Sequence, residues 1–146
     1  LLLGASGEFF PILFAVNPGV SFTFRKRNTI CFLTGGDIFE HYYLPLVLEY
    51  RYNVINNNVS PFIYANGGAL ISLSVNDADS KFKNGWTYGL GTGFRWPIGA
   101  IESFIKLGYR FAYTMEDRGI NPINSEVEYS FEYYFKRLEM KWGFTF

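Results

Sequence analysis

The sequence has no clear helical signature. No segment of ten or more residues keeps apolar side chains at the i, i+3, i+4, i+7 spacing of an amphipathic helix. No run approaches the roughly 18 uninterrupted apolar residues of a transmembrane helix. The opening LLLGASG lacks the charged region and full apolar core of a secretory signal, so it predicts the start of a strand. These absences argue against a helix bundle and against membrane crossing by helices.

Excess charge and paired cysteines are also missing. The chain has 13 Lys and Arg against 13 Asp and Glu, which gives a formal net charge of zero. A protein that binds the nucleic-acid backbone needs basic residues in surplus on one face, so nucleic acid is not expected as a partner. The one dense basic run, RKR at residues 25–27, is typical of a solvated turn. The single cysteine, Cys31, excludes an internal disulfide and fits a reducing or an oxidising compartment.

Aromatic residues and strict alternation are abundant instead. The chain contains 11 Tyr and 16 Phe among its 146 residues. Successive side chains of a strand point to opposite faces, and the final LEMKWGFTF is apolar on one face and polar or small on the other. The apolar face would carry Leu138, Met140, Trp142, Phe144 and Phe146. This pattern is typical of a strand that lies between two different solvents.

The same alternation predicts eight strands along the chain. They fall in residues 1–9, 12–24, 29–34, 42–53, 61–75, 86–96, 101–114 and from about 131 to 146, with no clear turn near residues 9–16. Short turns at 25–28, 55–58 and 97–100 alternate with longer connections near residues 37 and 79 and across the polar segment 116–130. Such alternation is characteristic of membrane barrels. We therefore predict one domain, residues 1–146, folded as an all-β, eight-stranded antiparallel up-and-down transmembrane β-barrel.

Charged residues gather on one face of the predicted strands, which we assign to the barrel interior. Unpaired buried charges are costly, so these four acids and five bases are expected to interlock as ion pairs that plug the barrel and leave no sizeable channel. Their positions are Glu8, Glu49, Arg51, Arg95, Glu102, Lys106, Arg110, Glu139 and Lys141. An eight-stranded barrel has little interior space, so large charged side chains need small residues beside them on the same face. These are Gly89, Gly91, Gly93, Gly108 and Gly143.

The opposite face is apolar and is assigned to lipid. The predicted lipid-facing residues are Leu44, Leu46, Leu48, Ile105, Leu107, Trp142 and Phe144. Tyr and Trp gather towards strand ends, as interfacial girdles require. The girdle candidates are Tyr42, Tyr43, Tyr50, Tyr52, Trp86, Trp96, Tyr113 and Trp142. A soluble β-sandwich is the alternative fold, but eight segments with one apolar face each would make a core too large for this chain to enclose.

Two segments resemble a known family. Residues 43–73, YLPLVLEYRYNVINNNVSPFIYANGGALISL, resemble the central hairpin of small outer-membrane β-barrel domains of Gram-negative bacteria, the PorT-like group especially. In that group a strand of the form YxxPLxxxYxF is followed by a short turn and PYxxAG. The terminal MKWGFTF resembles the family's last strand, which ends in an aromatic residue. The resemblance implies that Trp142, Phe144 and Phe146 form the signal read by the barrel-assembly machinery.

The resemblance also implies a location and partners. It places the chain in the bacterial outer membrane, in contact with its lipid and lipopolysaccharide, and suggests protein partners in a larger envelope complex of the secretion or nutrient-uptake type. The expected role is that of a non-enzymatic structural or accessory subunit. A lipid A-modifying barrel enzyme and a narrow passive pore are the alternatives.

Sequence motifs for catalysis or ligand binding are weak, so we predict no catalytic residue, cofactor or metal. The single histidine, His41, is followed by Tyr42 and Tyr43, whereas lipid A-modifying barrels resemble one another through a His-x-Ser segment on a strand. Asp77 and Asp79 in NDADS are too few for a calcium loop, which needs several more oxygen ligands. GLGTG at residues 89–93 lacks the GK[ST] and the following helix of a phosphate loop.

Overall fold

The computed structural model describes residues 2–4, 18–24, 27–38, 42–55, 57–73, 80–118 and 129–145. Within these ranges the regular structure consists of β-strands in one antiparallel sheet, which confirms the predicted all-β class. The same ranges contain no helix with the length and apolar character needed to cross a membrane.

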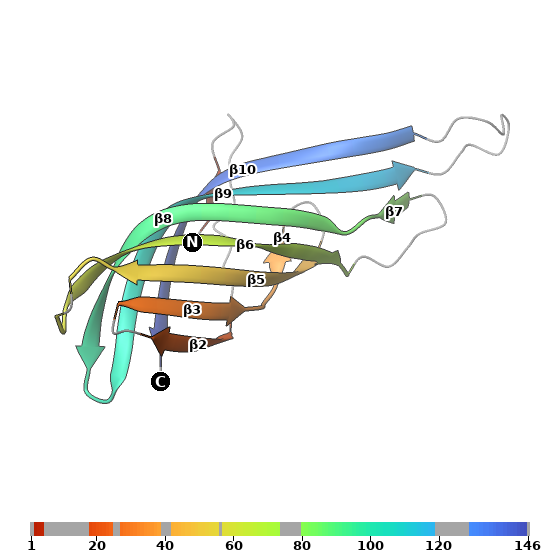
Figure 1. Cartoon of the computed structure of the whole chain (residues 1–146). Helices are drawn as coiled ribbons and strands as arrows, with labels where there is room; N and C mark the ends of the chain where they lie inside the picture. The colour runs from red at the N-terminus through yellow and green to blue at the C-terminus, as the bar shows by residue number, and fades with distance from the viewer. Residues whose placement is uncertain are drawn as a thin grey trace, which may run out of the picture.

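Seven strands of six or more residues make up most of the sheet. They are β2 (Gly19–Phe24), β3 (Asn28–Leu33), β5 (Tyr42–Asn53), β6 (Ser60–Ser72), β8 (Gly85–Ile98), β9 (Ile101–Arg118) and β10 (Tyr129–Thr145). The shorter β1 (Leu2–Gly4), β4 (Asp37–Ile38) and β7 (Ser80–Phe82) pair with β10, β5 and β9. The sheet order is β1-β10-β9-β8-β6-β5-β3-β2, so each long strand pairs with the next long strand along the chain (Figure 1).

Short and longer connections alternate as the sequence predicts. The β8–β9 turn is only Gly99 and Ala100, and the positive φ of Gly99, 64°, is a conformation that side chains other than glycine rarely adopt. The observed turn is shorter than the predicted turn at residues 97–100, because β8 continues to Ile98. The β2–β3 and β5–β6 connections are also short, and all three lie at the same end of the sheet (Figure 1).

The strands extend further than side-chain polarity predicts. The predicted loops near residues 37 and 79 contain β4 and β7, and the segment 116–130 begins and ends inside β9 and β10. Glu116, for example, is paired with Phe131 across the β9–β10 ladder. The physical reason is that ladder hydrogen bonds use backbone groups, so a strand can continue through polar residues once its neighbour is in place.

The sheet is strongly curved. This curvature is shown by side chains from strands that are not neighbours, which meet on one face. Lys106 of β9 contacts the carboxylate of Glu49 of β5, although β8 and β6 lie between these strands. Strands are spaced by about 4.8 Å, so a flat sheet would separate β5 from β9 by about 14 Å. Arg51 of β5 likewise lies 4.3 Å from the ring centroid of Phe104 on β9. We call the face on which these contacts occur the concave face, and the opposite face the convex face.

The first and last segments of the chain pair with each other. Leu2 lies opposite Glu139, and Gly4 lies opposite Arg137. Within the described ranges no ladder joins β1 to β2, so an eighth full strand and the closure of the ring stay predictions.

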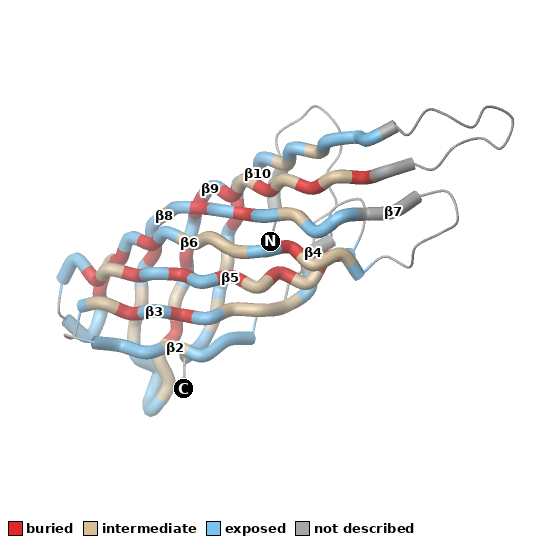
Figure 2. The backbone as a smooth tube through the Cα atoms, turned by 45° about the vertical axis from the view of Figure 1, so that its right-hand side comes forward, coloured by how far each residue is buried: buried red, intermediate tan, exposed pale blue. Residues whose placement is uncertain are grey.

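Burial alternates along the strands in the way a two-sided sheet requires (Figure 2). In β5 the buried side chains are those of Tyr43, Pro45, Val47, Glu49, Arg51 and Asn53, and the residues between them are exposed or half-buried. The concave face is therefore the buried one, and it includes most of the charges of the strands.

A small apolar cluster lies on the concave face towards the end of the longer connections. Tyr43, Leu70 and Ala112 are at most 2% exposed, and Phe135 packs against them. The assignment of Tyr43 to an interfacial girdle is therefore wrong. Its position in the alternation places it on the same face as Val47 and Glu49, inside the curve of the sheet.

Candidate functional site

The most distinctive site is the charged interior of the curved sheet, and Glu49 is one of its two centres. The Glu49 side chain has no exposed surface. Its carboxylate accepts a hydrogen bond from Arg51 Nε at 2.6 Å and a longer hydrogen bond from Asn66 Nδ2 at 3.3 Å. It also forms an ion pair with the Lys106 ammonium. The predicted residues Glu49, Arg51 and Lys106 thus form one cluster, with Asn66 added.

Glu139 is the second centre and is held by three cations. Its Oε1 lies 3.2 Å from Arg110 and 3.1 Å from Arg137, and its Oε2 lies 3.1 Å from Lys141. The Glu139 side chain is only 3% exposed. Arg137 was absent from the predicted set. It lies within the predicted last strand, at the alternate position before Glu139 and one residue before the segment LEMKWGFTF, so following the alternation back past Leu138 would have found it.

The remaining predicted residues lie apart from these centres. Arg95 pairs with Glu102 at 2.8 Å, with side chains 19% and 37% exposed, nearer to solvent than the two centres. Glu8 lies outside the described residues. The structure therefore places eight of the nine predicted charges on the concave face, in two buried clusters and one more exposed pair.

Aromatic rings fill the space beside the Glu49 cluster, which the sequence interpretation missed. The Arg51 guanidinium lies 4.3 Å from the Phe104 centroid and 5.5 Å from that of Phe62, and Lys106 Nζ lies 4.7 Å from the Tyr64 centroid. Cations over ring faces are attracted by the ring quadrupole.

The interior glycines leave room for these rings. A Cβ added at Gly93 would lie 2.5 Å from Phe62 Cζ, and one at Gly143 would lie 2.5 Å from Phe104 Cζ. The prediction that small residues provide interior space holds at these positions, but the space is taken by aromatic rings as well as by charged groups.

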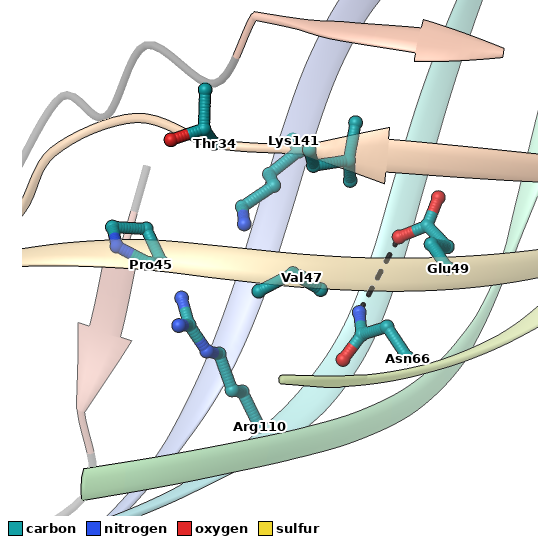
Figure 3. A pocket seen from close by; sticks show the side chains of 8 residues that line it. Thr34, Pro45, Val47, Glu49, Asn66, Arg110 and Lys141 are labelled. Atoms are coloured by element: carbon teal, nitrogen blue, oxygen red, sulfur yellow. Dashed lines mark hydrogen bonds between the residues drawn. The ribbon is translucent and has the colours of Figure 1, made fainter. Parts of the chain in front are cut away.

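A small cavity adjoins both carboxylate centres (Figure 3). The volume open to the centre of a water molecule is about 20 Å³. Its wall includes Glu49, Asn66, Arg110 and Lys141, together with Leu33, Thr34, Pro45 and Val47. Figure 3 shows the Lys141 amine and the Arg110 guanidinium extending towards this space, and the bond between Asn66 and Glu49 at its edge.

The convex face has the opposite character. Leu48, Leu107 and Trp142 are 57%, 47% and 68% exposed, and Ile105 and Phe144 are also exposed. Leu44 and Leu46 are half-buried on the same face, and Phe146 lies outside the described residues. Large apolar side chains are thus exposed on every long strand of the sheet.

Aromatic side chains on the convex face pack against one another. Trp86 stacks on Tyr88 with centroids 5.6 Å apart, and Tyr113 lies 5.1 Å from Tyr134. Further along β10, the Trp142 indole donates a hydrogen bond of 2.8 Å to Ser103 Oγ. Ser103 is fully buried although it lies on this face.

No metal site is evident in the described ranges, where no group of three or more His, Cys, Asp and Glu side chains could hold an ion. The sequence candidates His41, Asp77 and Asp79 lie outside these ranges.

Comparison with protein-family models, with curated proteins and with solved structures returns no match.

Proposed function

We propose that the chain is a non-enzymatic integral outer-membrane protein. In this proposal it forms an eight-stranded antiparallel up-and-down β-barrel and serves as a structural or accessory subunit of a larger envelope complex of the secretion or nutrient-uptake type. The PorT-like resemblance motivates the choice of membrane and complex.

The observation that carries the membrane proposal is the distribution of polarity between the two faces. Glu49 and Glu139 are buried with their cations on the concave face, whereas Leu48, Leu107 and Trp142 are exposed on the convex face. A water-soluble protein exposes a contiguous apolar surface of this extent only where it binds a partner or a membrane. A barrel in lipid needs an apolar outer band and tolerates a polar interior.

The spacing of aromatic residues on the convex face supports the same proposal. Trp86 and Trp96 on β8 are ten residues apart, as are Tyr42 and Tyr52 on β5. Ten residues of strand span about 34 Å, and a tilt of about 40° reduces this to about 25 Å across the bilayer. That distance matches the height of the apolar band between the aromatic girdles of outer-membrane barrels.

The subunit role is proposed because the short connections leave little chain outside the membrane at one end. Isolated turns such as Gly99 and Ala100 give a free-standing receptor little surface with which to bind a ligand.

Native purification tests both parts of the proposal. An epitope inserted at residues 57–59, an exposed connection, leaves the C-terminal strand unchanged. We expect the tagged chain in the outer-membrane fraction and, after extraction in mild detergent, in a species much larger than its own mass of 16.8 kDa plus the micelle. Recovery in the soluble fraction would contradict the membrane proposal. Recovery from the outer membrane as an isolated chain would contradict the subunit role alone.

A further inference from the structure

Five aromatic rings pack side by side on the convex face, towards the end of the sheet that has the longer connections. Trp86 and Tyr88 of β8 lie 5.4 Å and 5.0 Å from Phe111 of β9, measured between ring centroids. Tyr134 of β10 lies 6.1 Å from Phe111, and Tyr113 of β9 lies 5.1 Å from Tyr134. We call these five residues the aromatic cluster. Aromatic side chains gathered at one end of the outer face of a barrel are typical of a membrane–water interface.

Polar groups begin just beyond the aromatic cluster, on the side away from the short turns. Tyr134 donates a hydrogen bond of 2.8 Å to Glu132, an exposed residue that precedes it on β10. Lys83 is exposed as well, and its backbone nitrogen donates to the carbonyl of Met115, two residues past Tyr113 on β9. In the proposed barrel, the boundary between lipid and water would therefore lie at the level of the aromatic cluster.

Lys136 places a positive charge inside this apolar surface. It lies on β10 directly opposite Phe111, and its side chain is exposed. Among the convex-face residues that the structure describes on β8, β9 and β10, no other charged residue lies between Tyr134 and the β8–β9 turn. No described residue forms an ion pair or a hydrogen bond with the Lys136 side chain. Glu132 lies four residues away, about 14 Å along the strand with Tyr134 between them, which is too far to pair with it.

The position of Lys136 indicates which partner its charge would meet. A lysine on an apolar surface keeps its methylenes among apolar groups and extends its ammonium towards the nearest polar region. In outer-membrane barrels the longer connections face the outside of the cell, and the short turns face the periplasm. With that orientation the Lys136 ammonium lies at the depth of the outer-leaflet headgroups. That leaflet consists largely of lipopolysaccharide, whose lipid A headgroup is a disaccharide that carries phosphates.

We propose that Lys136 and the aromatic cluster form a binding site for the phosphorylated sugar headgroup of lipid A. Lys136 binds a phosphate, and the rings of Trp86 and Tyr134 pack against the apolar face of a sugar ring and the first segments of the acyl chains. The charge of the lysine is complementary to that of the phosphate, and the rings match the apolar parts of the same molecule. The inference rests on the proposed outer-membrane location and adds to it a specific lipid and the site that recognises it.

The test follows Trp86 by ¹⁹F NMR in the full chain, labelled with 5-fluorotryptophan and reconstituted in phosphatidylcholine nanodiscs. Lipid A with its phosphates is added in increasing amounts, and lipid A without phosphates is added in parallel. For the wild type we expect the Trp86 signal, identified by its absence in Trp86→Phe, to shift and saturate with phosphorylated lipid A. Trp142, near the short-turn end of the sheet, should show no saturable shift.

Two substitutions of Lys136 separate its charge from its packing. Lys136→Met keeps most of the apolar length of the side chain and removes the charge. We expect it to need about fivefold more phosphorylated lipid A for half of the shift, which corresponds to about 1 kcal/mol for one lysine near an anionic membrane surface. Lys136→Arg keeps the charge and should respond like the wild type. Both variants should fold, because position 136 is exposed.

Three results would overturn the lipid A site. One is an equal lipid A requirement in the wild type and in Lys136→Met. Another is an equal response to lipid A with and without phosphates. The third is a saturable shift of Trp142 as large as that of Trp86. If the chain inserts into the nanodiscs and gives any of these results, the lipid A site alone fails. A chain that folds in water and does not insert would contradict the membrane proposal as well.

Discussion

Glu49 and Lys106 illustrate how burial decides the strength of a single ion pair. Both side chains are almost completely buried, and Glu49 also holds Arg51. Removing Lys106 would leave the buried Glu49 carboxylate with only Arg51 and Asn66 as partners, and breaking a buried ion pair costs about 3–5 kcal/mol. We therefore expect Lys106→Met to lower the free energy of unfolding by that amount, measured by denaturant titration of the chain refolded in lipid or detergent.

Arg95 and Glu102 provide the matched control for Lys106→Met. Their side chains are 19% and 37% exposed, and exposed pairs contribute about 0–1 kcal/mol. Arg95→Met should therefore have a much smaller effect on the free energy of unfolding. Equal losses for the two variants would show that the Glu49 cluster is as well hydrated as the outer pair, and would contradict its description as buried.

At the level of the strand, the close approach of β8 and β9 depends on glycine. A Cβ added at Gly91 would lie 2.5 Å from the Gly108 Cα and 2.8 Å from Tyr64 Cε1. Because the first of these atoms belongs to the backbone, the strain cannot be relieved by a side-chain rotation alone. Overpacking of this kind costs about 1–3 kcal/mol, so Gly91→Ala should lower the denaturation midpoint.

Gly67 on the adjacent strand β6 is the control for Gly91. It lies on the convex face, and a Cβ there would lie no closer than 3.8 Å to its nearest neighbour, the Thr87 carbonyl oxygen. Gly67→Ala should be neutral or should stabilise the chain by about 0.4–1 kcal/mol, because alanine reduces the freedom of the unfolded chain. A larger loss from Gly67→Ala than from Gly91→Ala would contradict this packing.

For the whole molecule, the question is whether the convex face contacts lipid or water. Leu107 lies near the middle of the apolar band on β9, and Ile98 lies at the β8–β9 turn. In a lipid-facing position an arginine costs about 2–4 kcal/mol at the bilayer midplane and about 0–1 kcal/mol near the interface. We expect Leu107→Arg to impair folding into lipid vesicles by that larger amount, and Ile98→Arg to have little effect.

The same pair of variants distinguishes lipid from water. Both positions are exposed, with 47% and 50% of their surface accessible. In a soluble protein, arginine at either position would be solvated and both variants would fold equally well without lipid. That outcome would contradict the barrel proposal.

Much of the fold followed from alternation alone. The period of two in residues 42–53 matches β5, and the same pattern assigned Glu49, Arg51 and Lys106 to one face. The ends of the strands were harder to place. Asp37 and Glu116 were expected in loops because polarity suggests solvent, whereas both lie in strands whose ladders are formed by backbone groups.

The sequence by itself determined the two-sided character of this protein, because side-chain period in a strand is set by backbone geometry and is independent of the partner strand. It could not determine which acid meets which base. Glu49 is 57 residues from Lys106 along the chain and meets it only because the sheet curves. Likewise, only the tertiary structure decided that the interior glycines face the rings of Phe62 and Phe104, since that contact depends on the curvature and register of several strands together.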